Sequence, residues 1–79
     1  MNPAPTDGYS ITIRLRLANK PGVLGVVTST IGAAGGSIGA IDIVEAAFDH
    51  LVRDITIACG NDQHAREIVE AVKLASRGA

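Results

Sequence analysis

The sequence predicts an α+β fold, a two-layer sandwich of one antiparallel sheet and two helices. Apolar and polar residues alternate from about Tyr9 to Leu17, which indicates a strand with one face on a core. At residues 17–24 the two-residue period changes to a helical one, and a second helical stretch lies near the end of the chain. Two β-rich runs lie between these helical stretches, so the expected order is β-α-β-β-α.

The first helix is expected to begin at Pro21 or Gly22, since proline suits a first helical turn. It should end before the pair at 35–36, which can supply the left-handed residue of a C-terminal cap. Gly25 and Gly32 inside it each cost up to about 1 kcal/mol relative to alanine. We therefore expect these glycines to mark close packing against the sheet or a partner helix.

The second strand is expected over residues 37–45 and the third over about 51–59, joined by a hairpin connection at 46–50. Four residues of the third strand share the core-facing side: Leu51, Ile55, Ile57 and Cys59. Arg53 has the same parity, so we expect it at the rim of the core with its charged end turned outward. The second helix should follow with Asn61 or Asp62 as its N-cap.

Few sheet topologies are compatible with this order of elements. A right-handed crossover places the third strand between the first and the second, which gives a ferredoxin-like sheet of order 1-3-2 with both helices on one face. The fourth strand that usually closes such a sheet is missing from this chain, so we expect the first strand to have an open edge. Either the chain is truncated at its C-terminus or another molecule completes the edge.

The composition indicates one small domain. Residues 1–8 contain Pro3, Pro5 and Gly8 without periodicity and are expected to be a flexible leader before a domain at 9–79. The sequence is 47% hydrophobic, yet it has one Phe, one Tyr and no Trp, and its mean hydropathy is +0.29. So apolar a chain of this length should have a face that a second copy, or the rest of a larger protein, covers.

Charge and cysteine content exclude several classes of function. The net charge is −1 without charged runs, which argues against a nucleic-acid or membrane-surface partner, because both need a basic patch. A single cysteine and no signal peptide make the cytoplasm the expected location.

No catalytic or metal-binding constellation is apparent. His50 and His64 have no carboxylate or cysteine at metal-ligand spacing, so both are interpreted as surface residues and no metal or cofactor is expected. Cys59 is expected to be a small core residue. Acidic residues of the strands are expected on a solvated face: Asp42, Glu45 and Asp54. The domain alone is therefore not expected to be an enzyme.

The best candidate for a ligand site is the corner between the first strand and the first helix. Asn19 can hydrogen-bond free backbone N–H groups, and Gly22 allows another group to approach the main chain. The first N–H groups of the helix, near Val23 and Leu24, are left without helical partners and could hold a small anion or an amino acid. The alternative interpretation is an ordinary strand-to-helix turn.

The corner sequence Asn-Lys-Pro-Gly-Val-Leu at 19–24 and Gly-Gly-Ser-Ile at 35–38, in this element order, resembles the ACT domain family over about residues 9–75. The stretches 36–44 and 53–57 are similar more narrowly to the N-terminal ACT domain of bacterial NAD-dependent malic enzymes. ACT domains are regulatory domains that pair and bind an amino acid or similar effector at the seam between two copies.

The resemblance implies effector contacts from five residues: Asn19, Gly22, Val23, Leu24 and Ser37. Two positions differ from the serine-binding branch, which has a histidine in place of Leu17 and an asparagine in place of Ser37. The implied function is a non-catalytic domain that binds an amino acid or organic acid, self-associates as a homodimer or larger homo-oligomer, and allosterically controls an attached malic-enzyme-type oxidoreductase. The alternative is a purely structural subunit-association domain without an effector, and a small enzyme is a weaker third hypothesis.

Overall fold

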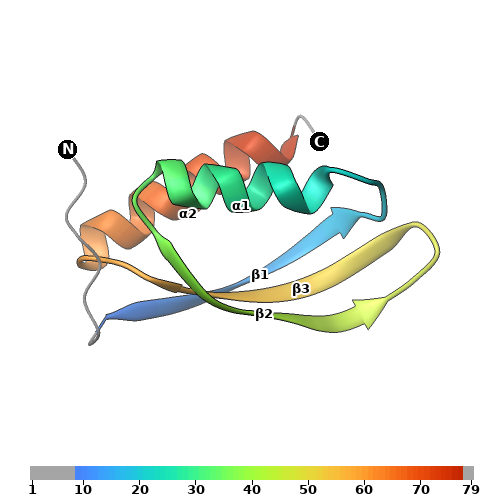
Figure 1. Ribbon diagram of the computed structural model, residues 1–79, viewed down its shortest axis with the longest axis horizontal. Helices are drawn as coiled ribbons and strands as arrows, with labels where there is room; N and C mark the ends of the chain where they lie inside the picture. Colours follow the sequence, from blue (N-terminus) through green and yellow to red (C-terminus); the bar gives the residue numbers. More distant parts are fainter. Residues whose placement is uncertain (1–8, 78–79) are drawn as a thin grey trace.

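A computed structural model describes residues 9–77 (Figure 1). The expected leader at 1–8 lies outside the described residues. The elements are β1 (Ser10–Ala18), α1 (Val23–Ala33), β2 (Ser37–Ala46), β3 (His50–Ala58) and α2 (Asp62–Arg77). The predicted order β-α-β-β-α is confirmed, with strand bounds within about one residue of those expected from the sequence.

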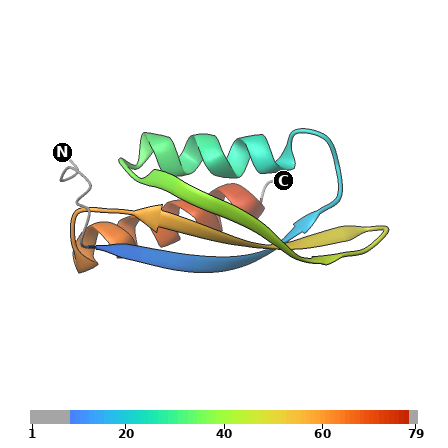
Figure 2. The ribbon, with the colours of Figure 1, turned by 60° about the horizontal axis from the view of Figure 1, so that its bottom comes forward.

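The three strands form one antiparallel sheet in the order β1-β3-β2, as predicted. Both helices cover the same face of this sheet (Figure 1), and α1 packs against α2. Figure 2 shows the strong twist that carries the β2–β3 hairpin out beyond the helices. Within residues 9–77, β1 and β2 each pair with β3 alone, so each has one open edge.

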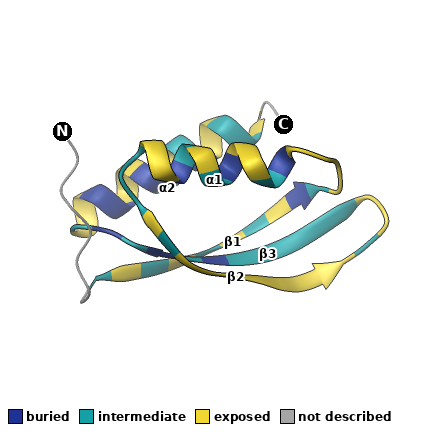
Figure 3. Cartoon of the chain, viewed as in Figure 1, coloured by how far each residue is buried: buried dark blue, intermediate teal, exposed yellow. Residues whose placement is uncertain are grey.

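The helix-facing side of the sheet is apolar apart from Arg53 and forms the core with the buried stripes of the helices. Among residues 9–77, ten hydrophobic residues are buried there: Leu17, Val23, Val27, Ile31, Ile55, Ile57, Cys59, Ala65, Ile68 and Val72. Cys59 is 0% exposed, which confirms the expectation of a core cysteine. In contrast, β2 is exposed from residue 39 to residue 46 (Figure 3).

The opposite side of the sheet is polar. Arg14 on β1 donates through Nε and Nη2 to the two carboxylate oxygens of Asp54 on β3, at 2.8 and 3.0 Å. The hydroxyls of Thr12 and Thr56 lie 3.1 Å apart on the same two strands. Asp42 stands opposite Asp54 in the register and is exposed. The expectation that the strand acids occupy a solvated face is therefore met by these carboxylates.

Helix α1 ends as the sequence predicts. Gly35 has φ 88°, and the amide of Gly36 donates to the carbonyl of Ile31 at 3.0 Å while that of Gly35 donates to Gly32 at 3.0 Å. This is the bonding of a Schellman cap, which needs the left-handed residue that glycine supplies.

The expected packing role of the glycines within α1 is not found between α1 and the sheet. Gly25 and Gly32 are exposed, and a Cβ added at either would meet no heavy atom within 4 Å in the described chain. Both residues lie on the outward face of α1, because the buried stripe of the helix is formed by Val23, Val27 and Ile31.

The interpretation of His64 as a surface residue is wrong. This side chain, in the first turn of α2, is 0% exposed. Its Nδ1 accepts the amide of Gly60 at 2.8 Å, and its Nε2 lies 2.7 Å from the carbonyl oxygen of Ala34, to which it donates. Backbone groups thus satisfy both ring nitrogens, so the imidazole can be buried at a low cost. Of the two residues predicted as the N-cap of α2, Asn61 and Asp62, it is Asn61 that caps the helix, since its Oδ1 accepts the amide of His64 at 2.8 Å.

Candidate functional site

The corner between β1 and α1 is a tight turn over residues 19–22. The amide of Lys20 donates to the carbonyl of Ala18 at 2.9 Å, and that of Val23 points to the carbonyl of Lys20 at 3.5 Å. Gly22 is the N-cap of α1 with φ 87°, and no side chain caps the helix. A Cβ at Gly22 would meet nothing within 4 Å. The left-handed backbone, rather than a close approach to the main chain, is the reason for glycine here.

Asn19 bonds to the β2–β3 hairpin instead of capping the helix. Its backbone amide donates to the carbonyl of Asp49 at 3.1 Å. Its side-chain Nδ2 donates to the carbonyl oxygens of Ala47 at 3.2 Å and Phe48 at 3.4 Å. The corner and the hairpin tip are separated in sequence by all of α1 and β2, and Asn19 links them through these hydrogen bonds.

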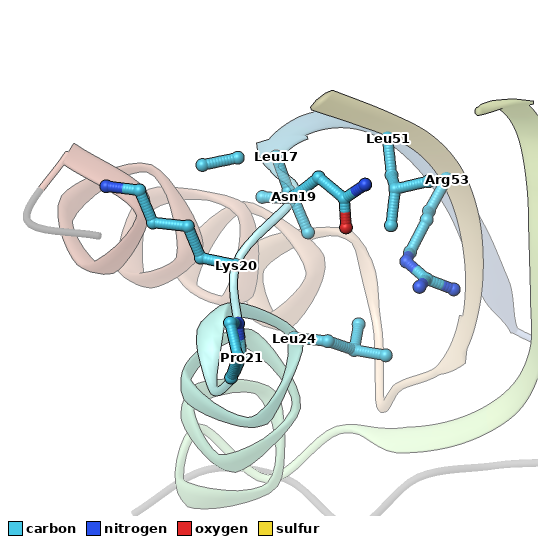
Figure 4. A pocket seen from close by; sticks show the side chains of 8 residues that line it. Leu17, Asn19, Lys20, Pro21, Leu24, Leu51 and Arg53 are labelled. Atoms are coloured by element: carbon cyan, nitrogen blue, oxygen red, sulfur yellow. The ribbon is translucent and has the colours of Figure 1, made fainter. Parts of the chain in front are cut away.

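A pocket of about 260 Å³ opens beside this link (Figure 4). It is lined by residues from the corner, from α1 and from β3: Leu17, Ala18, Asn19, Lys20, Pro21, Leu24, Leu51 and Arg53. Five of these eight residues are apolar, three of them leucine, and the charged residues among them are Lys20 and Arg53. This combination of apolar walls and few polar groups is typical of small-molecule sites.

The structure brings together some of the residues that the sequence selected. Asn19 and Leu24 line the pocket, whereas Gly22 and Val23 do not, and Val23 is 7% exposed in the core. Ser37 pairs with Ala58 at the end of β3, whereas the corner lies beside His50 at the start of β3. Ser37 and the corner are therefore at opposite ends of the sheet. Within one chain Ser37 therefore does not meet Asn19, and a contact across two copies stays a prediction.

The ligand-site prediction did not include Arg53 and Leu51. Both lie on the helix-facing side of β3, next to the predicted corner only because β3 is the central strand. The sequence did contain one signal for Arg53: it is a charged residue at a position that alternates in step with the core-facing residues of β3. As expected for a rim position, its side chain is partly buried rather than enclosed.

His50, the first residue of β3, lies on the polar side of the sheet. It is less exposed than expected for a surface residue. Its side chain is 16% exposed, with Nε2 2.6 Å from Glu45 Oε2 and Nδ1 2.9 Å from Asp49 Oδ1. The hydrogen bonds to Glu45 and then to Asp49 raise the pKa of His50 above its ordinary value. The hydrogen bond from His50 in turn lowers the pKa of Asp49.

Metal-binding and membrane-spanning features are not seen in the described part of the chain. Residues 9–77 contain no group of three or more His, Cys, Asp or Glu side chains placed to hold a metal ion. Neither helix in this range has the length and apolar character needed to cross a bilayer.

Comparisons with known proteins place the sequence beside parts of larger enzymes. No protein-family model matches the sequence. The chain is 31% identical over 67 residues to NAD-dependent malic enzyme 1 of Bacillus subtilis (strain 168), and the match covers 85% of this chain and 15% of that enzyme. It is 36% identical over 64 residues to NAD-dependent malic enzyme of Geobacillus stearothermophilus, covering 81% of this chain and 13% of that enzyme.

Among solved structures, the chain is similar to a protein described as GqqA, a novel type of quorum quenching acylases. The TM-score is 0.70 at 20% sequence identity, over 96% of this chain and 28% of that one. At this identity the likeness concerns the fold alone. GqqA, like the two malic enzymes, is several times longer than the region that this chain matches.

Proposed function

We propose that this chain is a regulatory domain of the ACT type, which binds a small metabolite, an amino acid or an organic acid, and allosterically controls an attached malic-enzyme-type oxidoreductase. The observation that carries the proposal is the pocket of about 260 Å³ at the corner that the sequence singled out. The similarity to two NAD-dependent malic enzymes supports the identity of the attached domain. The matches cover only 15% and 13% of those enzymes, so most of each enzyme lies outside the region that resembles this chain.

A non-catalytic role is supported by the chemistry of the described residues. Cys59, the nucleophilic side chain with the strongest intrinsic reactivity, is buried, and burial raises the pKa of its thiol. His64 has both ring nitrogens bonded to backbone groups, so it is not available as a base. The described part of the chain thus offers a binding pocket without an activated nucleophile beside it.

A purely structural association domain is the second candidate, and one observation favours it. Apolar side chains are exposed along β2 and at the hairpin tip: Ile41 at 37%, Ile43 at 59%, Val44 at 46% and Phe48 at 99%. The outer edge of β2 is also open within residues 9–77. Covering this surface with a second copy would remove both the apolar exposure and the open edge.

A thermal-shift screen of the 79-residue chain against amino acids and dicarboxylates tests the sensor function. A ligand at about 100 times its dissociation constant should add roughly 2.7 kcal/mol to the stability of the fold. Leu24→Lys, which places a long side chain in the pocket, should abolish that gain. Val26→Lys is the matched control, because Val26 lies on the same helix, is 46% exposed and does not line the pocket.

Two results would separate the candidate functions. Stabilisation by a metabolite that is lost in Leu24→Lys and kept in Val26→Lys supports the sensor. No stabilisation by any compound, together with a stable dimer in sedimentation experiments, favours the structural domain.

A further inference from the structure

Arg53 is an unusual cation, since its strand neighbours on the helix-facing side are apolar. Leu15 of β1 and Ile43 of β2 stand directly opposite it in the two registers, and Leu51 and Ile55 flank it along β3. The other charged strand residues lie on the polar side, where Arg14 has the carboxylate of Asp54. Within residues 9–77, no ion pair or side-chain hydrogen bond involves Arg53.

A guanidinium in such a setting is suited to a carboxylate. Arg53 as a residue is partly buried, and an anion that binds its guanidinium bidentately replaces the hydrogen bonds of the water it displaces. Arginine presents a planar fork that matches the two oxygens of a carboxylate. The pocket beside Arg53 is the space in which such an anion can lie.

The rest of the pocket limits the ligand to one negative charge and a short apolar chain. Leu17, Leu24 and Leu51 form its walls. In Figure 4 the amine of Lys20 is turned away from these side chains, whereas the guanidinium of Arg53 lies on the side of Leu24. A second carboxylate placed against the three leucines would have no partner there, which is costly. The volume of about 260 Å³ suits a metabolite of a few carbon atoms.

Asn19 adds an acceptor to this arrangement. Its Nδ2 faces the carbonyl oxygens of Ala47 and Phe48, which fixes the amide, because the reversed amide would place oxygen against oxygen. The Oδ1 then lies on the pocket side of the amide in Figure 4. Within the described chain, no donor to this oxygen is found. A ligand with an ammonium or hydroxyl group beside its carboxylate would supply that donor.

We infer that Arg53 is the anion-binding residue of the pocket, and that the pocket takes a monocarboxylate with a short aliphatic chain and a hydrogen-bond donor on the α-carbon. The inference rests on the proposed sensor function and specifies its ligand. The chemistry is that of an aliphatic α-amino acid or α-hydroxy acid, held by Arg53 at one end, by Asn19 Oδ1 at the α-substituent and by leucine at the chain.

Calorimetry of the 79-residue chain with a matched set of probes tests the ligand chemistry. The probes are L-valine, 2-hydroxyisovalerate, isovalerate, valinol and L-aspartate. We expect L-valine or 2-hydroxyisovalerate to bind most tightly, isovalerate more weakly because it lacks the donor, and valinol not at all because it lacks the carboxylate. Tighter binding of L-aspartate than of both branched acids, or equal binding of valinol, would overturn the inference.

Substitution of the arginine tests its role. Arg53→Leu should weaken the tightest probe by about 10- to 100-fold, the effect of losing a charge-assisted hydrogen bond, while Arg53→Lys should lose less. Arg66→Leu is the control, since it removes one exposed arginine of α2 that does not line the pocket. A thermal melt of each variant reports whether it is folded. If Arg53→Leu does not fold, the ratio of the dissociation constants of Arg53→Lys and wild type for the tightest probe decides whether Arg53 binds the carboxylate.

The outcomes also separate this inference from the proposed function. Binding of a branched acid that is unchanged in the Arg53 variants would overturn the role of Arg53 and leave the sensor function standing. Failure of all five probes would overturn the ligand class, whereas the sensor function would then depend on the wider screen of amino acids and dicarboxylates.

Discussion

The side-chain amide of Asn19 donates to the carbonyl oxygen of Ala47 at 3.2 Å and so ties the β1–α1 corner to the β2–β3 hairpin. Replacing Asn19 by alanine removes this bond and the one to Phe48 at 3.4 Å. We expect Asn19→Ala to lower the free energy of unfolding by about 1 kcal/mol. Asn19→Asp should cost more at neutral pH, because it sets a carboxylate against two carbonyl oxygens. Urea denaturation measures both, and values within about 0.5 kcal/mol of wild type for both would contradict the link.

Gly22 and Gly25 should respond to alanine in opposite directions. Gly22 has φ 87°, a conformation that costs an L-residue roughly 1–2 kcal/mol, so Gly22→Ala should destabilise the chain by that amount. Gly25 lies within α1 with no heavy atom within 4 Å of an added Cβ, so Gly25→Ala should stabilise by up to about 1 kcal/mol. Thermal melts of the pair give the two signs. Destabilisation by Gly25→Ala would indicate that another molecule packs closely on that face.

Local patterns were enough to predict the secondary structure and the sheet order, because each depends on neighbours in the sequence and on few topological choices. The alternation in β1, the glycine cap of α1 at Gly35 and the N-cap Asn61 all act within a few residues. The sheet order then follows from handedness.

The pocket could be predicted only in part, because its parts come from three elements. The corner supplies Asn19 and α1 supplies Leu24, and both were selected from the local sequence. Arg53 comes from β3, and the alternation of that strand predicted only that it lies at the rim of the core. The bonds from Asn19 to the hairpin depend on the twist of a distant turn, which no local pattern encodes. The burial of His64 depends in the same way on Ala34, thirty residues away.

His64 should be a main determinant of stability. Its imidazole is fully buried and bonds to Gly60 and to Ala34 at the junction of the two helices. His64→Ala removes the volume and both bonds, so we expect a loss of about 3–5 kcal/mol. His64→Phe keeps most of the volume and should lose about 1–3 kcal/mol, the cost of the polar partners alone. Gln63→Ala, at the exposed neighbouring position, should stay within about 0.5 kcal/mol of wild type. Equal losses for alanine and phenylalanine in urea denaturation would show that packing contributes little.

The cluster of His50, Glu45 and Asp49 should make the stability of the fold depend on pH. Hydrogen bonds to Glu45 and then to Asp49 raise the pKa of His50 above its ordinary 6.5, so the folded chain holds this proton more tightly than the unfolded chain. The contribution is therefore fully present below about pH 6.5 and is lost as the pH rises through the higher folded value. The pKa of Asp49 is lowered from 3.8, chiefly by the hydrogen bond from His50, so its contribution is lost only as the pH falls below that range.

Melting temperatures measured between about pH 6 and about pH 8 test this dependence. We expect the melting temperature of the wild type to fall over this interval and that of Glu45→Gln to fall less, because the variant lacks the largest cause of the raised pKa of His50. Glu67→Gln, which removes an exposed carboxylate of α2, should keep the wild-type slope. Proton NMR of the His50 ring should show its titration midpoint above 6.5 in the wild type and lower in Glu45→Gln. The same slope in all three chains would mean that the hydrogen bond of 2.6 Å between His50 and Glu45 does not control the proton.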